Sequence, residues 1–352
     1  FAAACATKHF LEENNLAGTV KFFGCPAEEG GSGKTFMVRD GVFEGVDVAL
    51  TWHPGDVNDI MSTSSLACYQ AFFKFEGISS HAAASPHLGR SALDAVELMN
   101  LGVNYLREHV IPDARMHYAV LNSGGISPNV VQAEAEVLYL IRAPIVKQVD
   151  DIFKRVVKIA EGAALMTETK MTMTFDEGCS NYIPNRALEN ILFKSLKDST
   201  LEEPTEEENV FAKEIWESLS PVEKDNHIET AKTKVNANDY EGKYLCDFIS
   251  PYTPSDRVMP GSTDVSDVSW VVPTAQLRTA TKALGTPGHS WQMTSQGISS
   301  FAHKGMLRAA EAMAKTAIHL FNHDDDLLKV KKEFEAFRAN NPYICPIPKD
   351  AK

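Results

Sequence analysis

The stretch AEAEVLYLIRAPIVKQVDDIFKRVVKIAEGAAL, residues 133–165, contains two different periodicities in succession. Residues 133–142 alternate apolar and polar side chains, and a period of two predicts a strand with one buried face. From residue 145 the apolar side chains recur every three or four positions, which predicts an amphipathic helix over 145–165. A strand followed at once by such a helix indicates a sheet that is covered by helices.

Similar patterns lie on both sides of this stretch. Strands are predicted over residues 67–76, 116–122 and 169–175, and a helix over 90–110. The resulting order, β-α-β-β-α-β, is that of the ferredoxin-like split unit. We therefore expect residues 68–180 to form a compact inserted domain. Residues 1–67 and 181–352 would then be the two parts of a second domain.

The flanking segments favour an α/β fold with a mostly parallel sheet. Before the insert, a helix up to Glu13 precedes a short buried strand at Val20–Gly24, a helix over 35–44 and a strand from Val46 to Leu50. After residue 210, helices and short strands lead to a long helix over 297–322. Strands that alternate with helices predict parallel pairing, and ligands of such sheets lie beyond the carboxyl ends of the strands.

Composition excludes several classes of protein. The chain has 352 residues, 44% of them hydrophobic and 23% charged, which is typical of a globular protein of about two domains. Its net charge of −13 argues against nucleic-acid or anionic-membrane binding. No apolar run is long enough for a membrane span. The six cysteines lack paired spacing, which argues against a disulfide framework and favours a cytoplasmic location.

The chain opens without a methionine, and Phe1–Glu13 reads as the middle of a helix. A domain rarely begins inside a helix. We therefore expect a further segment upstream of Phe1.

Glu28 and Glu29 form the strongest local signal. They lie between Pro26-Ala27 and Gly30-Gly31, directly after an apolar run. Adjacent glutamates are commonly solvated, but here proline and glycine fix the loop at the end of a predicted strand. Two carboxylates that point in different directions can divide the work: one binds a metal, and the other takes a proton from water.

Two histidines have a context that suits metal binding. His53 follows an apolar strand in Trp52-His53-Pro54, and His289 lies in the loop GTPGHSW, residues 285–291. Each could simply belong to a turn. Together with the glutamates they make a donor set suited to Zn²⁺ or Mn²⁺.

Two other chemistries are not indicated. The chain has no GxSxG elbow, which argues against a serine hydrolase of that type. The run GGSGKT, residues 30–35, lacks the first glycine of a phosphate-binding loop because residue 28 is Glu.

Several motifs in order resemble those of the dinuclear metal amidohydrolases and carboxypeptidases, a family that includes carboxypeptidase G and the indole-acetyl-amino-acid hydrolases. The matching segments are GCPAEEGG (24–31), WHP (52–54), GISSHAAASP (77–86), SPNVV (127–131) and the loop around His289. Together they cover nearly the whole chain. The family's His-x-Cys-Gly-His motif, which stands upstream of the glutamate pair and supplies further metal ligands, has no counterpart in this sequence.

The resemblance implies a role for each matched residue. Glu28 would be the general base, and Glu29, His53 and His289 would bind a pair of divalent ions, Zn or Mn. His81, on the inserted domain, would reach the active site of a partner subunit and polarise the scissile carbonyl.

Asn129 and Arg142 would hold the substrate carboxylate or the developing oxyanion. The inserted domain would act as a lid and as the dimerisation domain, in a homodimer or in a hetero-oligomer with a related subunit.

The implied reaction is hydrolysis of an amide bond to a C-terminal amino acid, as in p-aminobenzoyl-glutamate or a related N-acyl-glutamate. Two alternatives stay open. One is a dipeptidase or N-acyl-amino-acid hydrolase of the same family. The other is a catalytically incomplete subunit that binds a substrate without cleaving it.

Overall fold

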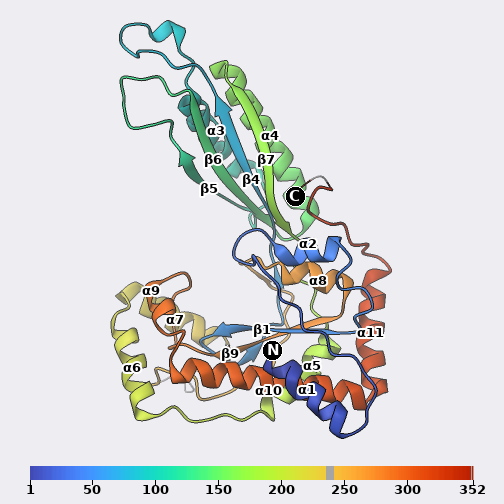
Figure 1. Ribbon diagram of the computed structural model, residues 1–352. Helices are drawn as coiled ribbons and strands as arrows, with labels where there is room; N and C mark the ends of the chain where they lie inside the picture. Colours follow the sequence, from blue (N-terminus) through green and yellow to red (C-terminus); the bar gives the residue numbers. More distant parts are fainter. Residues whose placement is uncertain (235–241, 350, 352) are drawn as a thin grey trace.

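The computed structural model describes residues 1–234, 242–349 and 351. It has two parts (Figure 1): an elongated lid, residues 67–179, stands on a broader body formed by the segments before and after it. The chain enters the lid through β4 and leaves it through β7, which are neighbouring antiparallel strands. The lid is thus attached to the body by two adjacent strand ends.

The lid is a four-stranded antiparallel sheet with two helices on one face. In space the strands follow the order β5-β6-β4-β7. The elements in chain order are β4 (Ala67–Glu76), η1 (Pro86–Leu88), α3 (Ala92–Leu106), η2 (Arg107–His109), β5 (Arg115–Asn122), β6 (Glu134–Ala143), α4 (Val146–Thr167) and β7 (Lys170–Cys179). The predicted β-α-β-β-α-β order is confirmed.

Alternation along the strands explains why the helices cover one face only. Phe73 and Phe75 of β4 and Tyr139 of β6 are completely buried against α3 and α4, whereas their sequence neighbours face the other way. Burying a side chain of this size stabilises the fold by about 1.5–3 kcal/mol. All buried members of this cluster lie between residues 67 and 164, so the lid has a hydrophobic core of its own.

The body is built on a small sheet in which β1 (Ala49–Gly55) and β9 (Thr274–Ala280) are parallel neighbours. The short β2 (Asp59–Ile60) pairs antiparallel with β9. A separate parallel pair joins β3 (Ser64–Ser65) to β8 (Val258–Met259). The α/β class predicted from the sequence is therefore confirmed.

Helices pack on both faces of the β1–β9 sheet. One face carries α5 (Arg186–Lys197) and α10 (Ser300–Asn322), with α1 (Ala2–Glu13) and α11 (Asp324–Arg338) packed outside them. α2 (Gly33–Arg39) and α8 (Val265–Val271) pack together near the base of the lid (Figure 1). A side lobe contains α6 (Glu206–Glu217), α7 (Pro221–Lys234) and α9 (Trp291–Ser295).

The strand predicted at Val20–Gly24 is wrong. These residues form no strand, and the side chain of Phe22 is 62% exposed. A strand needs a hydrogen-bonded neighbour, and none of the strands in the described part of the chain runs beside this segment. The strand predicted from Val46 begins at Ala49 and continues to Gly55, so His53 lies within it.

None of the helices among the described residues is long and apolar enough to cross a membrane.

Candidate active site

The two glutamates project from a tightly folded loop. Ala27, just before Glu28, has a φ of 58°, and Ser32 has a φ of 49°. These left-handed conformations are unfavourable for residues with a side chain, so the surroundings must hold them. The loop closes on itself at Gly33, where an added Cβ would lie 2.1 Å from the carbonyl oxygen of Pro26.

The loop continues into α2, which is bound to α8. Asp264 accepts hydrogen bonds from both the backbone N–H and the side-chain Nζ of Lys34, each at 2.8 Å. One residue further along, the hydroxyl of Thr35 donates to the buried carboxylate of Asp267. These contacts fix the start of α2, and with it the end of the glutamate loop.

Glu28 lies beside His53 of β1. The imidazole holds the pKa of Glu28 below its usual value, assisted by the hydroxyl of Thr263 and opposed by partial burial. Trp52 packs with α5 and α10, so alternation places His53 on the opposite face of the sheet, next to Arg278 of β9. A charged carboxylate beside an imidazole can accept a proton from a bound molecule.

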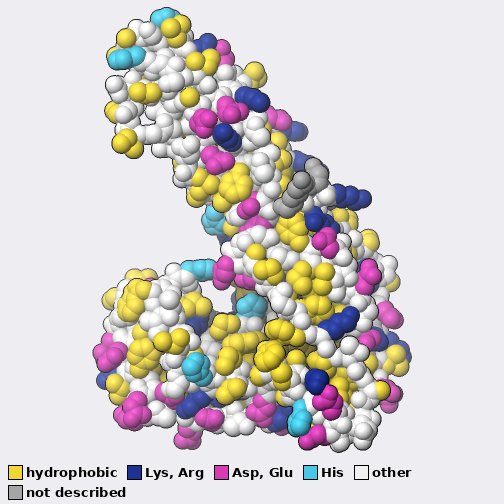
Figure 2. Space-filling model, viewed as in Figure 1, with side chains coloured by type: hydrophobic (Ala, Val, Ile, Leu, Met, Phe, Trp, Pro, Cys, Tyr) yellow, Lys and Arg dark blue, Asp and Glu magenta, His cyan; other side chains and the backbone are white. Residues whose placement is uncertain are grey.

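Glu29 points toward a different histidine. Its Oε2 lies 4.0 Å from Nε2 of His289, and both side chains are more than four-fifths exposed. His289 has a φ of 53° in the loop that precedes α9. Figure 2 shows an opening between the side lobe and the rest of the molecule, with histidine and acidic side chains at its rim. The two glutamates therefore occupy different environments, one half-buried and one exposed.

The side chains of these residues are of the types that bind a divalent metal ion. Nδ1 of His53 is buried and makes no hydrogen bond to any residue that the structure describes, so this atom has an unused lone pair or proton. Imidazole nitrogen and carboxylate oxygen are ligands that Zn²⁺ and Mn²⁺ accept. Within residues 1–234, 242–349 and 351, however, no three His, Cys, Asp or Glu side chains stand close enough together to hold an ion.

His81 and Asn129 lie together at the tip of the lid. His81 forms an isolated bridge with Val130, and the N–H of Ala82 donates to the carbonyl of Asn129 at 2.9 Å. Nδ1 of His81 accepts from the N–H groups of Ala83 and Ala84, at 3.2 and 3.1 Å. In the neutral imidazole this assigns the proton to Nε2, which is then an exposed donor.

Arg142 lies at the other end of the lid, near its base. It stands on β6, paired with Cys68 of β4 on one side and with Arg115 of β5 on the other. Its Nε is buried and has no hydrogen-bond partner among the described residues. The structure thus pairs Glu28 with His53 and Glu29 with His289, and it places His81 and Asn129 far from Arg142.

Comparisons of the sequence with known proteins all point to one family of peptidases and hydrolases. Residues 69–167 match the family model described as a peptidase dimerisation domain. The chain is 52% identical to one of the subunits of the p-aminobenzoyl-glutamate hydrolase of Escherichia coli K12, over 99% of this chain and 74% of that protein. It is 30% identical to the Xaa-Arg dipeptidase of Mus musculus, over 95% of this chain and 67% of that protein.

The chain belongs to the M20 peptidase family. A solved structure, an aminobenzoyl-glutamate utilization protein from Klebsiella pneumoniae, shares the fold with a TM-score of 0.59 and 18% identity. The alignment covers 90% of this chain and 66% of that one, so the chain spans about two thirds to three quarters of these M20 relatives. Family membership confirms the prediction of a metal-dependent amidohydrolase or peptidase.

Thr263 and Asp264 contact Glu28 and Lys34 of the M20 glutamate loop, and neither residue was predicted from the sequence. The polar run Ser262-Thr263-Asp264 before α8 suggests a helix start, but nothing local connects it to residues so far upstream.

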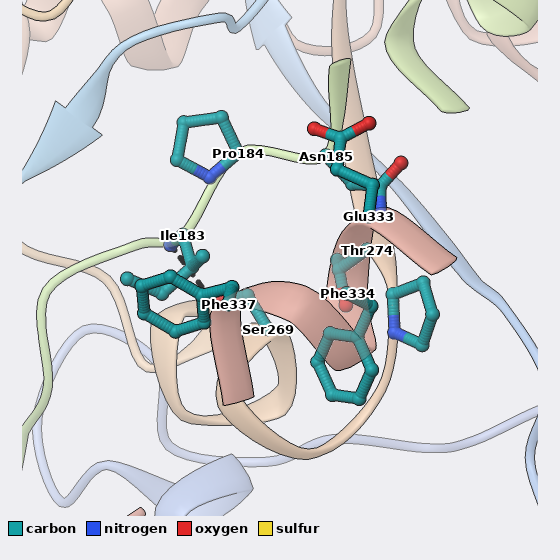
Figure 3. Close-up of a pocket in the computed structure, with 9 residues that line it drawn as sticks. Ile183, Pro184, Asn185, Ser269, Thr274, Glu333, Phe334 and Phe337 are labelled. Atoms are coloured by element: carbon teal, nitrogen blue, oxygen red, sulfur yellow. Dashed lines mark hydrogen bonds between the residues drawn. The ribbon is translucent and has the colours of Figure 1, made fainter. Parts of the chain in front are cut away.

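A pocket lined by other residues than this M20 site lies between α8, β9 and α11 (Figure 3). Its volume is about 150 Å³, and it is lined by residues near the amino end of β9, among them Ser269, Thr274 and Phe337. Glu333 in its wall accepts hydrogen bonds from the N–H groups of Arg186 and Ala187 at the start of α5. The carboxylate of Glu333 therefore caps the start of α5.

Proposed function

We propose that this protein hydrolyses the amide bond between p-aminobenzoate and glutamate, or the same bond in a related N-acyl- or N-aroyl-glutamate. The pairing of Glu28 with His53 and of Glu29 with His289 carries the proposal, because each pair combines a carboxylate with an imidazole, the donor types of a metal-dependent hydrolase. The 52% identity to a subunit of the Escherichia coli hydrolase supports the choice of substrate.

The proposed cofactor is a pair of divalent ions, Zn or Mn. Glu29, His53 and His289 would hold it, and the unused Nδ1 of His53 supports this assignment. When bound, the ions supply Lewis acidity for the attacking water and the scissile carbonyl. A dinuclear centre needs more donors than these three, and the family resemblance assigns the others to a motif upstream of the glutamate pair.

Side chains of the protein would transfer the proton and bind the substrate. Glu28 takes the proton of the attacking water and gives it to the leaving amine. Arg142 pairs with the free carboxylate of the leaving amino acid, for which its planar fork is suited, and its unpartnered Nε supports this role.

His81 and Asn129 would act from the lid tip of a second subunit. The Nε2–H of His81 is a donor that could stabilise the oxyanion, and Asn129 lies next to it. The second subunit is another copy of this chain or a related one. The match to a dimerisation domain supports an assembly. The Escherichia coli hydrolase is named with two different subunits and the chain is similar to both, which favours two subunit types.

The test measures cleavage of p-aminobenzoyl-glutamate and of its α-amide and γ-amide analogues by the full-length protein. Arg142→Ala should raise KM for the glutamate substrate about 10- to 150-fold, the equivalent of losing a charge-assisted pair of roughly 1.5–3 kcal/mol. The KM for the amide analogue that lacks the carboxylate bound by Arg142 should rise much less. An equal rise in KM for the glutamate substrate and for its amide analogues would show that Arg142 does not bind the carboxylate.

A dipeptidase is the second candidate, favoured by the 30% identity to the mouse Xaa-Arg dipeptidase. A higher kcat/KM for Xaa-Arg dipeptides than for p-aminobenzoyl-glutamate would show that the protein is a dipeptidase.

The absence of a three-donor group among the described residues favours a third candidate, a subunit that binds without cleaving. Metal analysis after dialysis separates it from the enzyme, which should retain about two ions per chain.

A further inference from the structure

The loop that carries Glu28 and Glu29 is also bound to the lid. The backbone N–H of Gly31 donates a hydrogen bond to Oε2 of Glu177, and the hydroxyl of Ser32 lies 3.4 Å from the same oxygen. Glu177 belongs to β7, the strand through which the chain leaves the lid. A hydrogen bond to a charged carboxylate is roughly twice as strong as one between neutral groups.

An irregularity in β7 directs Glu177 at this loop. Gln70 of β4 pairs with Glu177, but the next residue, Ala71, pairs with Phe175, so Asp176 has no residue opposite it. A bulge of this kind interrupts the alternation of side chains. Glu177 therefore shares the sheet face of Gln70, whereas Phe175 shares the helix-covered face of Ala71. Bulges beside active sites often redirect a side chain in this way.

Glu177 contacts the loop at two residues that have a positive φ. Gly31 has a φ of 112° and Ser32 a φ of 49°. Glycine adopts a positive φ freely, but the left-handed conformation of Ser32 persists only where neighbouring groups hold it. Asp264 of the body holds the following turn through Lys34, and Glu177 holds Gly31 itself from the lid.

We propose that Glu177 is a positioning residue for the reaction at Glu28 and Glu29. By fixing the turn at Gly31 and Ser32, it sets the direction in which the two preceding carboxylates project. Because Glu177 stands on the lid, a lid movement that breaks this hydrogen bond also releases the loop. The inference rests on the proposed function, since it takes Glu28 as the base and Glu29 as a metal ligand.

The test compares Glu177→Ala and Glu177→Gln with a matched control, Asp176→Ala. Glutamine keeps an acceptor oxygen for the Gly31 N–H. The control removes the neighbouring carboxylate, which accepts from Gln70 at 2.7 Å and not from the loop. We expect Glu177→Ala to lower kcat for p-aminobenzoyl-glutamate about 10- to 100-fold with a much smaller change in KM, because a displaced catalytic group costs up to roughly 100-fold. Glu177→Gln should restore most of kcat, and Asp176→Ala should resemble the wild type.

Hydrogen–deuterium exchange of the peptide covering residues 26–34 measures the loop without substrate. Exchange there should become faster in Glu177→Ala and stay unchanged in peptides from α10. If Glu177→Ala does not fold, Glu177→Asp, with its shorter reach, replaces it.

Unchanged exchange in the loop, or an equal loss of kcat in Asp176→Ala, would overturn the proposal. If exchange of residues 26–34 becomes faster in Glu177→Ala but the wild-type protein cleaves no amide substrate, the contact between Glu177 and the loop is confirmed and the proposed function is wrong.

Discussion

Glu28 and Glu29 are neighbours in the chain, yet each has its own histidine. The half-buried Glu28 lies beside His53, and the exposed Glu29 faces His289 at 4.0 Å. A proton acceptor and a metal ligand need such different surroundings, because the acceptor must remain free to bind and release a proton.

Glu28→Gln should therefore lower kcat while the protein keeps its metal. Removing a general base typically costs roughly 10²–10⁴-fold in rate. Glu29→Gln should instead reduce the metal retained after dialysis. The measurements are steady-state kinetics and metal analysis of both variants. A Glu28→Gln protein with near-normal kcat would exclude Glu28 as the base.

Asp267 gives a prediction about pH and stability. Burial raises the pKa of this carboxyl to about 6, although Ser180, Thr35 and Tyr343 all donate hydrogen bonds to it. Its value in the unfolded chain is near 3.8, so between these values the folded state binds more protons than the unfolded state. The free energy of unfolding should therefore fall as pH rises through this window, by up to about 3 kcal/mol.

The test is urea unfolding of the wild type and of Asp267→Asn, which has no titrating group at this position. The stability of the wild type relative to the variant should decrease from about pH 4 to about pH 7. A difference that does not change with pH would show that Asp267 titrates normally.

At the residue scale, the sequence predicted the glutamate pair and the two histidines that lie beside it, because each carries a local context of proline, glycine or a strand end. Thr263 and Glu177 have no such context. Their roles depend on contacts between segments that are distant in the chain, and periodicity or spacing cannot predict these contacts.

Among the elements, the glutamate loop depends on the absence of a side chain at Gly33. Gly33→Ala would place a Cβ 2.1 Å from the carbonyl oxygen of Pro26, which forces the backbone apart. We expect this variant to lose activity and metal retention together. Gly30→Ala, in the same loop, is the matched control, since a Cβ there meets nothing within 4 Å.

Metal content, kcat and thermal unfolding of the two alanine variants check this prediction. If Gly33→Ala and Gly30→Ala have the same metal content, kcat and unfolding temperature, the close approach of Gly33 to Pro26 is not required for the site.

The elements also show where sequence patterns fail. The lid was predicted well because its strands and helices are neighbours in the chain and each has a clear period. The segment Val20–Gly24 has the composition of a buried strand, but strand formation requires a partner, and the pattern says nothing about partners.

At the scale of the whole molecule, one chain does not bring the proposed site together. The glutamate loop contacts the base of the lid through Glu177, whereas His81 lies beyond the far end of β4. The ten residues of β4 span about 30 Å. His81 therefore cannot reach Glu28 of its own chain in this arrangement, and a second subunit would have to supply it.

Mixing His81→Ala chains with Glu28→Gln chains should restore activity if the protein is a homodimer. A mixed dimer has one site with both defects and one site with neither, so random exchange should give about a quarter of wild-type activity. Each variant alone is the control. No recovery in a mixture that demonstrably exchanges subunits would count against a shared site.

The pairing of β1 with β9 also determines the order of events during synthesis. Ala49 has its hydrogen-bonded neighbour at Thr274, whereas every strand of the lid finds its partners within residues 67–179. On the ribosome, the lid can fold as soon as it has emerged, while the strand that bears His53 waits until β9 has been made. The apolar Leu50 and Trp52 are exposed during this interval, so we expect nascent chains stalled before residue 274 to bind chaperones through this segment.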